Sequence, residues 1–180
     1  MITVGVNGSG GRRSAGESAD VAERMPFDPE QFRRRYPGRA FPDVRFRSER
    51  ERWEADRALA GRYGPAAGDS PDGGRLWALF DRARPLDVAG ATAPASDAFY
   101  LTQLLGLYEL HSGAEVCLDW YMGEQMAVGF RDLVASFDAF WQPGVDDMAL
   151  FPESYDWVLY FTRDGGVRLL RADEGWWEQE

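Results

Sequence analysis

The sequence predicts an α+β domain with a small antiparallel sheet in its C-terminal half, packed against amphipathic helices. Three observations lead to this class. Apolar residues recur with helical spacing in 101–108 and 130–141. Residues 115–121 alternate between apolar and polar side chains, as a strand does. Short apolar runs at 148–151 and after it, separated by turn residues, are typical of antiparallel strands.

The first part of the chain is predicted to be mainly helical. Asp28 can cap a short helix, and Pro29 suits its first position. We expect this helix to end near Pro37. Residues 48–62 carry oppositely charged pairs at helical spacing, which predict a second helix. The apolar run 76–80 is predicted to be a third, short helix.

The helix at 48–62 is expected to lie on the outside of the molecule. Its apolar stripe is thin and contains Trp53, Ala60 and Tyr63. Charged residues cover the remaining surface, with Arg50 and Glu54 as one i,i+4 pair. A helix with so little apolar surface packs against the core along a narrow line.

Two amphipathic helices are predicted in the C-terminal half. The first follows Ser96, a plausible N-cap, and ends near Gly113. Its apolar residues in 101–108 fall on one face. The second covers 130–141 as one continuous helix, closed by the Pro143-Gly144 pair.

Strands are predicted at 115–121, 148–151, 157–162 and 167–171. In the first of them, the alternating pattern puts apolar residues on one side and mostly polar residues on the other. These two sides are Val116, Leu118 and Trp120, and Glu115, Cys117 and Asp119. Asp164-Gly165 lies between the last two strands and predicts a tight hairpin turn, because glycine readily adopts a positive φ.

Charge is divided unequally along the chain. Residues 1–90 contain sixteen arginines and fourteen acids, whereas residues 91–180 contain four arginines and sixteen acids, a net charge of −12. The chain has no lysine, so every cation other than the N-terminus is an arginine, apart from the single histidine. An acidic half rich in aromatic residues suggests a folded surface that binds something basic.

The domain organisation follows these shifts in composition. Residues 1–24 are rich in Gly, Ser and charge, which predicts a flexible N-terminal arm. Residues 25–180 are predicted to form a single α+β domain. Within it, an Arg-rich helical part covers 25–90 and an acidic part covers 96–180, joined through a linker-like stretch at 88–95.

We predict that the arm is dispensable for folding. A variant that starts at Met25 should melt within about two degrees of the full chain, because residues 1–24 contain too little apolar surface to offset the entropy of ordering them. Thermal melting of the two proteins checks this, and a larger loss would show that the arm packs on the domain.

Several classes of site are excluded by composition. One cysteine and one histidine exclude an intrachain disulfide, a Cys-based zinc site and a His-rich metal centre. The glycine-rich segment 5–14 has Gly11 where a phosphate-binding loop needs Lys. No targeting segment and no apolar run of membrane-spanning length is found. We therefore expect a cytoplasmic protein that binds no cofactor, metal or membrane.

His111 and Cys117 are interpreted as structural residues. His111 lies at a predicted helix end, where an imidazole can cap carbonyl groups. Cys117 lies between Glu115 and Asp119, and nearby carboxylates raise the pKa of a thiol, which disfavours a nucleophile.

A nucleic-acid interface is not expected. The arginines that could form one are Arg33, Arg34, Arg35, Arg39, Arg45 and Arg47. Acidic residues interrupt this region, and the whole chain has a net charge of −10, which opposes binding to phosphates. We expect the basic segment to dock on the acidic half of the same molecule.

Four acids near the strand that contains Trp157 are the candidate partner-binding residues: Asp146, Asp147, Glu153 and Asp156. They fall in loops, where side chains are free to meet a partner. Two other interpretations remain open for these acids together with Asp119 and Glu124. They can be solvated surface groups, or some can form a general acid/base pair or a hard-metal site.

The segment 140–147, with 154–159, resembles a pattern in small uncharacterised bacterial proteins. In that pattern an aromatic pair, a Pro and a paired Asp precede a strand with a Trp; here these are Phe140-Trp141, Pro143, Asp146-Asp147 and Trp157. Some such proteins look like immunity proteins, which block a toxin through an acidic face. The resemblance implies a non-enzymatic bacterial protein that occludes a basic partner such as a toxin.

Two alternative functions from other classes of protein remain open. One is a small carboxylate-dependent hydrolase or metal-dependent enzyme that uses the acidic C-terminal half. Another is an accessory protein of a biosynthetic or defence operon. Salt-sensitive capture of a basic protein would favour the binding module, whereas divalent-metal binding with turnover would favour the enzyme.

Overall fold

The computed structural model describes most of the chain: residues 29–64, 74–87, 98–120, 124–141, 144 and 147–173. The predicted arm at 1–24, the linker at 88–95, the cap at Ser96 and the candidate residue Asp146 lie outside the described residues. In the described part, no helix is long and apolar enough to cross a membrane.

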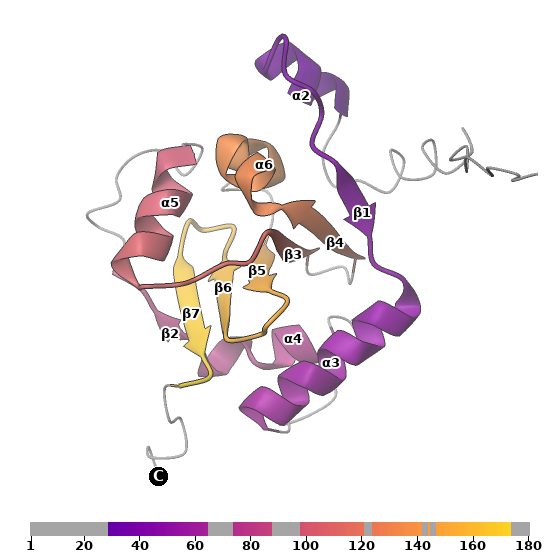
Figure 1. Cartoon of the computed structure of the whole chain (residues 1–180). Helices are drawn as coiled ribbons and strands as arrows, with labels where there is room; N and C mark the ends of the chain where they lie inside the picture. Colours follow the sequence, from indigo (N-terminus) through magenta and orange to yellow (C-terminus); the bar gives the residue numbers. More distant parts are fainter. Residues whose placement is uncertain are drawn as a thin grey trace, which may run out of the picture.

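Seven strands form one antiparallel sheet, and the predicted α+β class is confirmed (Figure 1). The strand order is β1-β4-β3-β5-β6-β7-β2, and every pair of neighbours is antiparallel. The strands are β1 (Val44–Phe46), β2 (Arg84–Pro85), β3 (Glu115–Trp120), β4 (Glu124–Gly129), β5 (Met148–Pro152), β6 (Trp157–Phe161) and β7 (Val167–Arg171). The five long strands all come from the C-terminal half.

The Arg-rich part of the chain supplies both edges of this sheet. β1 pairs with β4 at one edge, and β2 pairs with β7 at the other. The two strands have three and two residues, too few to show an alternating pattern, so the sequence did not predict them. Pro85 in β2 has no N–H to offer a further strand, which suits an edge position.

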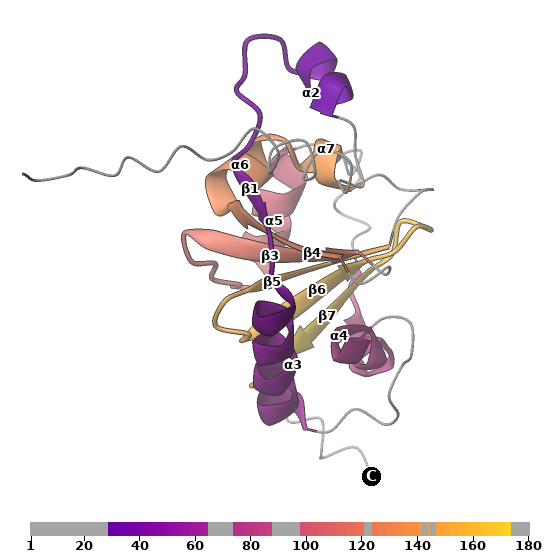
Figure 2. The same cartoon turned by 90° about the vertical axis from the view of Figure 1, so that its right-hand side faces the viewer.

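Helices cover both faces of the sheet (Figure 2). One face is covered by α5 (Ala98–Leu107), α6 (Phe130–Ala135) and α7 (Phe137–Phe140), and the other by α3 (Glu49–Tyr63), α4 (Gly74–Ala78) and the 3-10 helix η1 (Phe80–Arg82). Each face has its own apolar core. In β3, Val116 faces one core and Cys117 the other, so the strand is buried on both sides.

The predicted helix over 130–141 is wrong in one respect, because it is interrupted at Ser136. Ser136 has φ −146° and ψ 36°, which separates α6 from α7. Its hydroxyl donates to the Asp132 carbonyl at 2.7 Å, and its N–H donates to the Leu133 carbonyl at 3.1 Å. A serine side chain that bonds the preceding turn competes with continued helix. Strand β4, just before α6, was not predicted.

Helix α3 begins with a capping box at Ser48. The Glu51 N–H donates to the Ser48 hydroxyl, and the Ser48 N–H donates to the Glu51 carboxylate at 2.8 Å. The predicted Arg50–Glu54 pair is present at 2.9 Å. The buried face differs from the predicted stripe, because it contains Ala55 and Leu59 with Tyr63.

The hairpin between β6 and β7 has the predicted turn. Gly165 has φ 86°, a conformation that glycine adopts without strain. The Thr162 N–H donates to the Gly166 carbonyl at 2.9 Å, and Asp164 accepts from the Gly166 N–H at 3.1 Å. The turn therefore holds its own shape through local hydrogen bonds.

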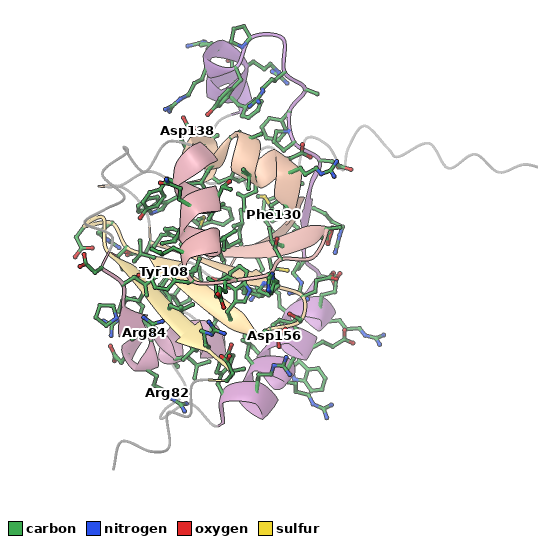
Figure 3. The ribbon with its side chains drawn as sticks, turned by 60° about the vertical axis from the view of Figure 1, so that its left-hand side comes forward. Arg82, Arg84, Tyr108, Phe130, Asp138 and Asp156 are labelled. Carbon is green, nitrogen blue, oxygen red and sulfur yellow. The ribbon has the colours of Figure 1, made fainter. Side chains whose placement is uncertain are left out.

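The N-terminal basic segment docks on the acidic half, as expected. Arg35, at the end of α2 (Pro29–Arg35), forms an ion pair with Asp138 of α7. Arg39 donates to the Ala135 carbonyl at 2.5 Å, and Arg45 lies 3.8 Å from Glu115. Figure 3 shows Asp138 on the side of α7 that faces α2.

Candidate functional site

The structure places the three described candidate acids, Asp147, Glu153 and Asp156, at two ends of the sheet. Asp147 comes directly before β5, and Glu153 comes directly after it. At about 3.3 Å per residue, these two positions are roughly 20 Å apart. Asp156 comes directly before β6 and therefore lies at the Glu153 end. A partner that contacts both groups of acids must span the length of β5.

The turn between β5 and β6, residues 153–156, is the best-defined part of this candidate site. Tyr155 has φ 55°, in the left-handed region that a bulky residue rarely adopts. Its N–H donates to the Pro152 carbonyl at 3.0 Å, and its carbonyl accepts from the Tyr63 hydroxyl at 2.9 Å. Its ring stacks on Phe151 at 5.8 Å. These contacts hold a strained backbone in one shape.

Arg47 supports the same turn from the side of β1. Its guanidinium donates to the Tyr155 hydroxyl at 3.3 Å and contacts the Cys117 Sγ at 3.5 Å. Arg47 is half-buried, and its backbone N–H donates to the Gln125 carbonyl of β4 at 2.9 Å, which ties it to the sheet. The turn is thus anchored to α3, β1 and β3 together.

The two acids of the turn differ in their surroundings. Glu153 is exposed, and among the described residues no cation forms an ion pair with its carboxylate. Asp156, which is labelled in Figure 3, forms an ion pair with Arg62 at the end of α3. Glu153 is therefore the acid of this turn whose charge is available to a partner.

Asp147, at the opposite end of β5, binds Arg163 of the same chain. One carboxylate oxygen accepts from the Arg163 N–H at 2.8 Å, and the other accepts from the Arg163 guanidinium at 2.9 and 2.5 Å. Its side chain is 18% exposed. Its role in partner binding stays a prediction, and its contacts show that it also holds the start of β5 against the β6–β7 hairpin.

Cys117 is a structural residue in its surroundings, as interpreted from the sequence. Burial raises the pKa of its thiol to about 11. Glu153 and Glu115 raise it further, while Arg47 opposes them. The neighbouring acids in the sequence correctly indicated that the pKa of the thiol is raised, but the main cause of the rise is burial. The thiol is neutral at physiological pH, so it is not poised as a nucleophile.

Asp119 is the one candidate acid in the interior of the described fold. It is 2% exposed and accepts a hydrogen bond from the Trp77 Nε1–H at 2.8 Å. Burial raises its pKa to about 7, while hydrogen bonds from Trp77 and Gln125 oppose the rise. A carboxyl group with this pKa can exchange a proton near neutrality. Among the described residues, no group of three or more His, Cys, Asp and Glu side chains could hold a metal ion.

Comparison with known proteins gives no family for this fold and site. No protein-family model matches the chain, and no curated protein or solved structure matches it. The site is thus defined by its own geometry: an exposed acid on a strained turn that Arg47 and Tyr155 hold in place. Sequence reasoning missed these two residues, because no local pattern reveals that Tyr155 has a positive φ.

Proposed function

We propose that the protein is a non-enzymatic, immunity-like binding module of the bacterial cytoplasm, whose acidic half occludes a basic protein partner. The observation that supports it most is the β5–β6 turn, which presents the exposed Glu153 next to the strained Tyr155. Strained backbone persists where the surrounding structure holds it, and such positions cluster at binding sites.

The rigidity of the turn supports recognition by a preformed surface. Tyr63, Arg47 and Phe151 fix Tyr155 before any partner arrives. A loop that is already ordered loses less entropy on binding, so more of the interaction energy appears as affinity. The net charge of −12 over residues 91–180 adds long-range attraction for a basic partner.

Neutralising the turn should slow association with the partner. The partner is captured from the native host with the immobilised full chain and identified. Binding kinetics are then measured at low and physiological salt for the wild type and the Glu153→Gln/Asp156→Asn variant. We expect a several-fold slower association rate and a flatter salt dependence, because two charges are lost while side-chain size is kept.

The matched control removes two charges at Asp146 and Asp147, which precede β5 in the sequence. Asp146→Asn/Asp147→Asn has the same net charge as the turn variant, so a difference between the two reports position rather than total charge. A larger decrease in the association rate for the turn variant supports the proposed site. An equal decrease for both variants indicates a partner that spans both ends of β5. An association rate that changes neither in the two variants nor with salt concentration would contradict electrostatic recognition.

A carboxylate-dependent enzyme is the second candidate, because Asp119 has a pKa of about 7, which suits a general acid or base. Its 2% exposure means that a substrate would have to reach it through a rearranged interior. Turnover that is abolished by Asp119→Asn in a protein that remains folded would favour this candidate over the binding module.

A further inference from the structure

The outer face of α3 carries an exposed aromatic residue. Among the described residues, two large hydrophobic side chains are exposed: Trp53 at 58% and Leu107 at 71%. The Arg57 guanidinium lies over the Trp53 ring, 5.2 Å from its centroid. Tryptophan and arginine are the residue types that contribute most to binding energy at protein interfaces.

The residues around this pair form one continuous surface. Five positions at spacings of three and four residues share the side of the helix away from the sheet, and we call them the α3 outer face: Arg50, Trp53, Glu54, Arg57 and Gly61. The opposite side, with Ala55, Leu59 and Tyr63, is buried. Figures 1 and 2 show α3 along the outside of the described fold.

The charges on the outer face are self-complementary in an antiparallel arrangement. A two-fold axis that passes between Ala55 and Asp56 places Glu54 of one copy opposite Arg57 of the other, twice. The same axis places Arg50 opposite Gly61. A Cβ atom added at Gly61 would meet no heavy atom within 4 Å. Gly61 itself has no side chain, so a second helix can approach the backbone closely there.

We propose that the protein forms a homodimer in which the α3 outer faces of two copies pack antiparallel, with Trp53 of each copy lying across the turn of the other that contains Arg57 and Gly61. This goes beyond the proposed function, since it concerns a different surface. A single pair of helices makes a small interface, so the dissociation constant is expected on the order of 10 μM.

Sedimentation equilibrium of the full chain tests the dimer, over protein concentrations from about 1 to about 200 μM, a range that brackets this constant. The wild type should show a reversible monomer–dimer equilibrium. Trp53→Ala should dimerise at least about tenfold more weakly. Leu107→Ala, at the other exposed large hydrophobic residue, is the matched control and should leave the equilibrium unchanged.

A charge exchange tests the arrangement itself. Glu54→Arg and Arg57→Glu should each weaken dimerisation, because each brings like charges together across the axis. The double variant Glu54→Arg/Arg57→Glu should recover the wild-type equilibrium, because both partners are exchanged. Circular dichroism shows that the variants keep their helices. A monomeric wild type, an unaffected Trp53→Ala or a double variant no better than the single variants would each overturn the proposal.

Discussion

Replacing Trp157 with alanine should lower the free energy of unfolding by about 3–5 kcal/mol. Trp157 is 3% exposed and lies in the core between the sheet and helices α5, α6 and α7. Its Nε1–H donates to the His111 carbonyl at 2.9 Å, which joins the start of β6 to the segment after α5. The substitution removes a large aromatic side chain and leaves a cavity. Urea unfolding followed by circular dichroism measures the change.

Two further variants separate the causes of this loss. Trp157→Phe keeps an aromatic ring but lacks the hydrogen bond to the His111 carbonyl. Its free energy of unfolding should therefore fall by less than that of the alanine variant. Asp164→Ala, in an exposed turn, should change stability far less, because Gly165 still supplies the positive φ. A folded Trp157→Ala protein with unchanged stability would show that Trp157 is not a core residue.

The sequence predicted four of the five long strands, but it predicted neither β4 nor the sheet that the strands form. Trp157–Phe161 was recognisable because all five of its residues are hydrophobic, and in the structure all five are buried. The edge strands β1 and β2 were not, because they are too short for a period and are defined by pairing with distant residues. Their pairing explains how the Arg-rich part and the acidic part share one sheet.

The candidate site shows a similar limit. Loop positions and charge indicated Glu153 and Asp156, and the structure brings these two to one end of the sheet. The sequence could not indicate that Arg163 holds Asp147, since two strands and the turn between them separate the two residues along the chain. Nor could it indicate that Asp119 is buried on the second face of β3, because the helices that cover this face come from residues before 91.

Asp119 should make the protein less stable as the pH rises toward neutrality. Burial raises the pKa of this carboxyl from 3.8 to about 7 in the folded protein. Between these values the folded state holds a proton that the unfolded state has released, so the free energy of unfolding falls as pH increases. Well above pH 7 the Asp119 carboxyl is ionised in both the folded and the unfolded state, and the free energy of unfolding falls no further. Over roughly 3 units, at about 1.4 kcal/mol per unit of pKa, the free energy of unfolding falls by roughly 4 kcal/mol in all.

Asp119→Asn should remove this loss, because it replaces the acid with a neutral group of the same size. Its Oδ1 can still accept from the Trp77 Nε1–H. Its amide can donate to Gln125 Oε1, which has no hydrogen-bond partner in the described structure, after a half-turn of the Gln125 amide. Urea unfolding at about pH 5 and pH 8.5, on either side of the folded pKa, should show a variant gain that is larger at the higher pH.

Asp164→Asn provides the contrast for this experiment. A hydrogen bond from Thr162 lowers the pKa of the exposed Asp164 in the folded protein. Its carboxylate therefore contributes stability that is present above the unfolded pKa and lost as pH falls, the opposite direction to Asp119. The Asp164 variant should lose stability at neutral pH, although by little, because solvent screens the group. An Asp119→Asn protein with the same pH dependence as the wild type would show that Asp119 ionises normally despite its burial.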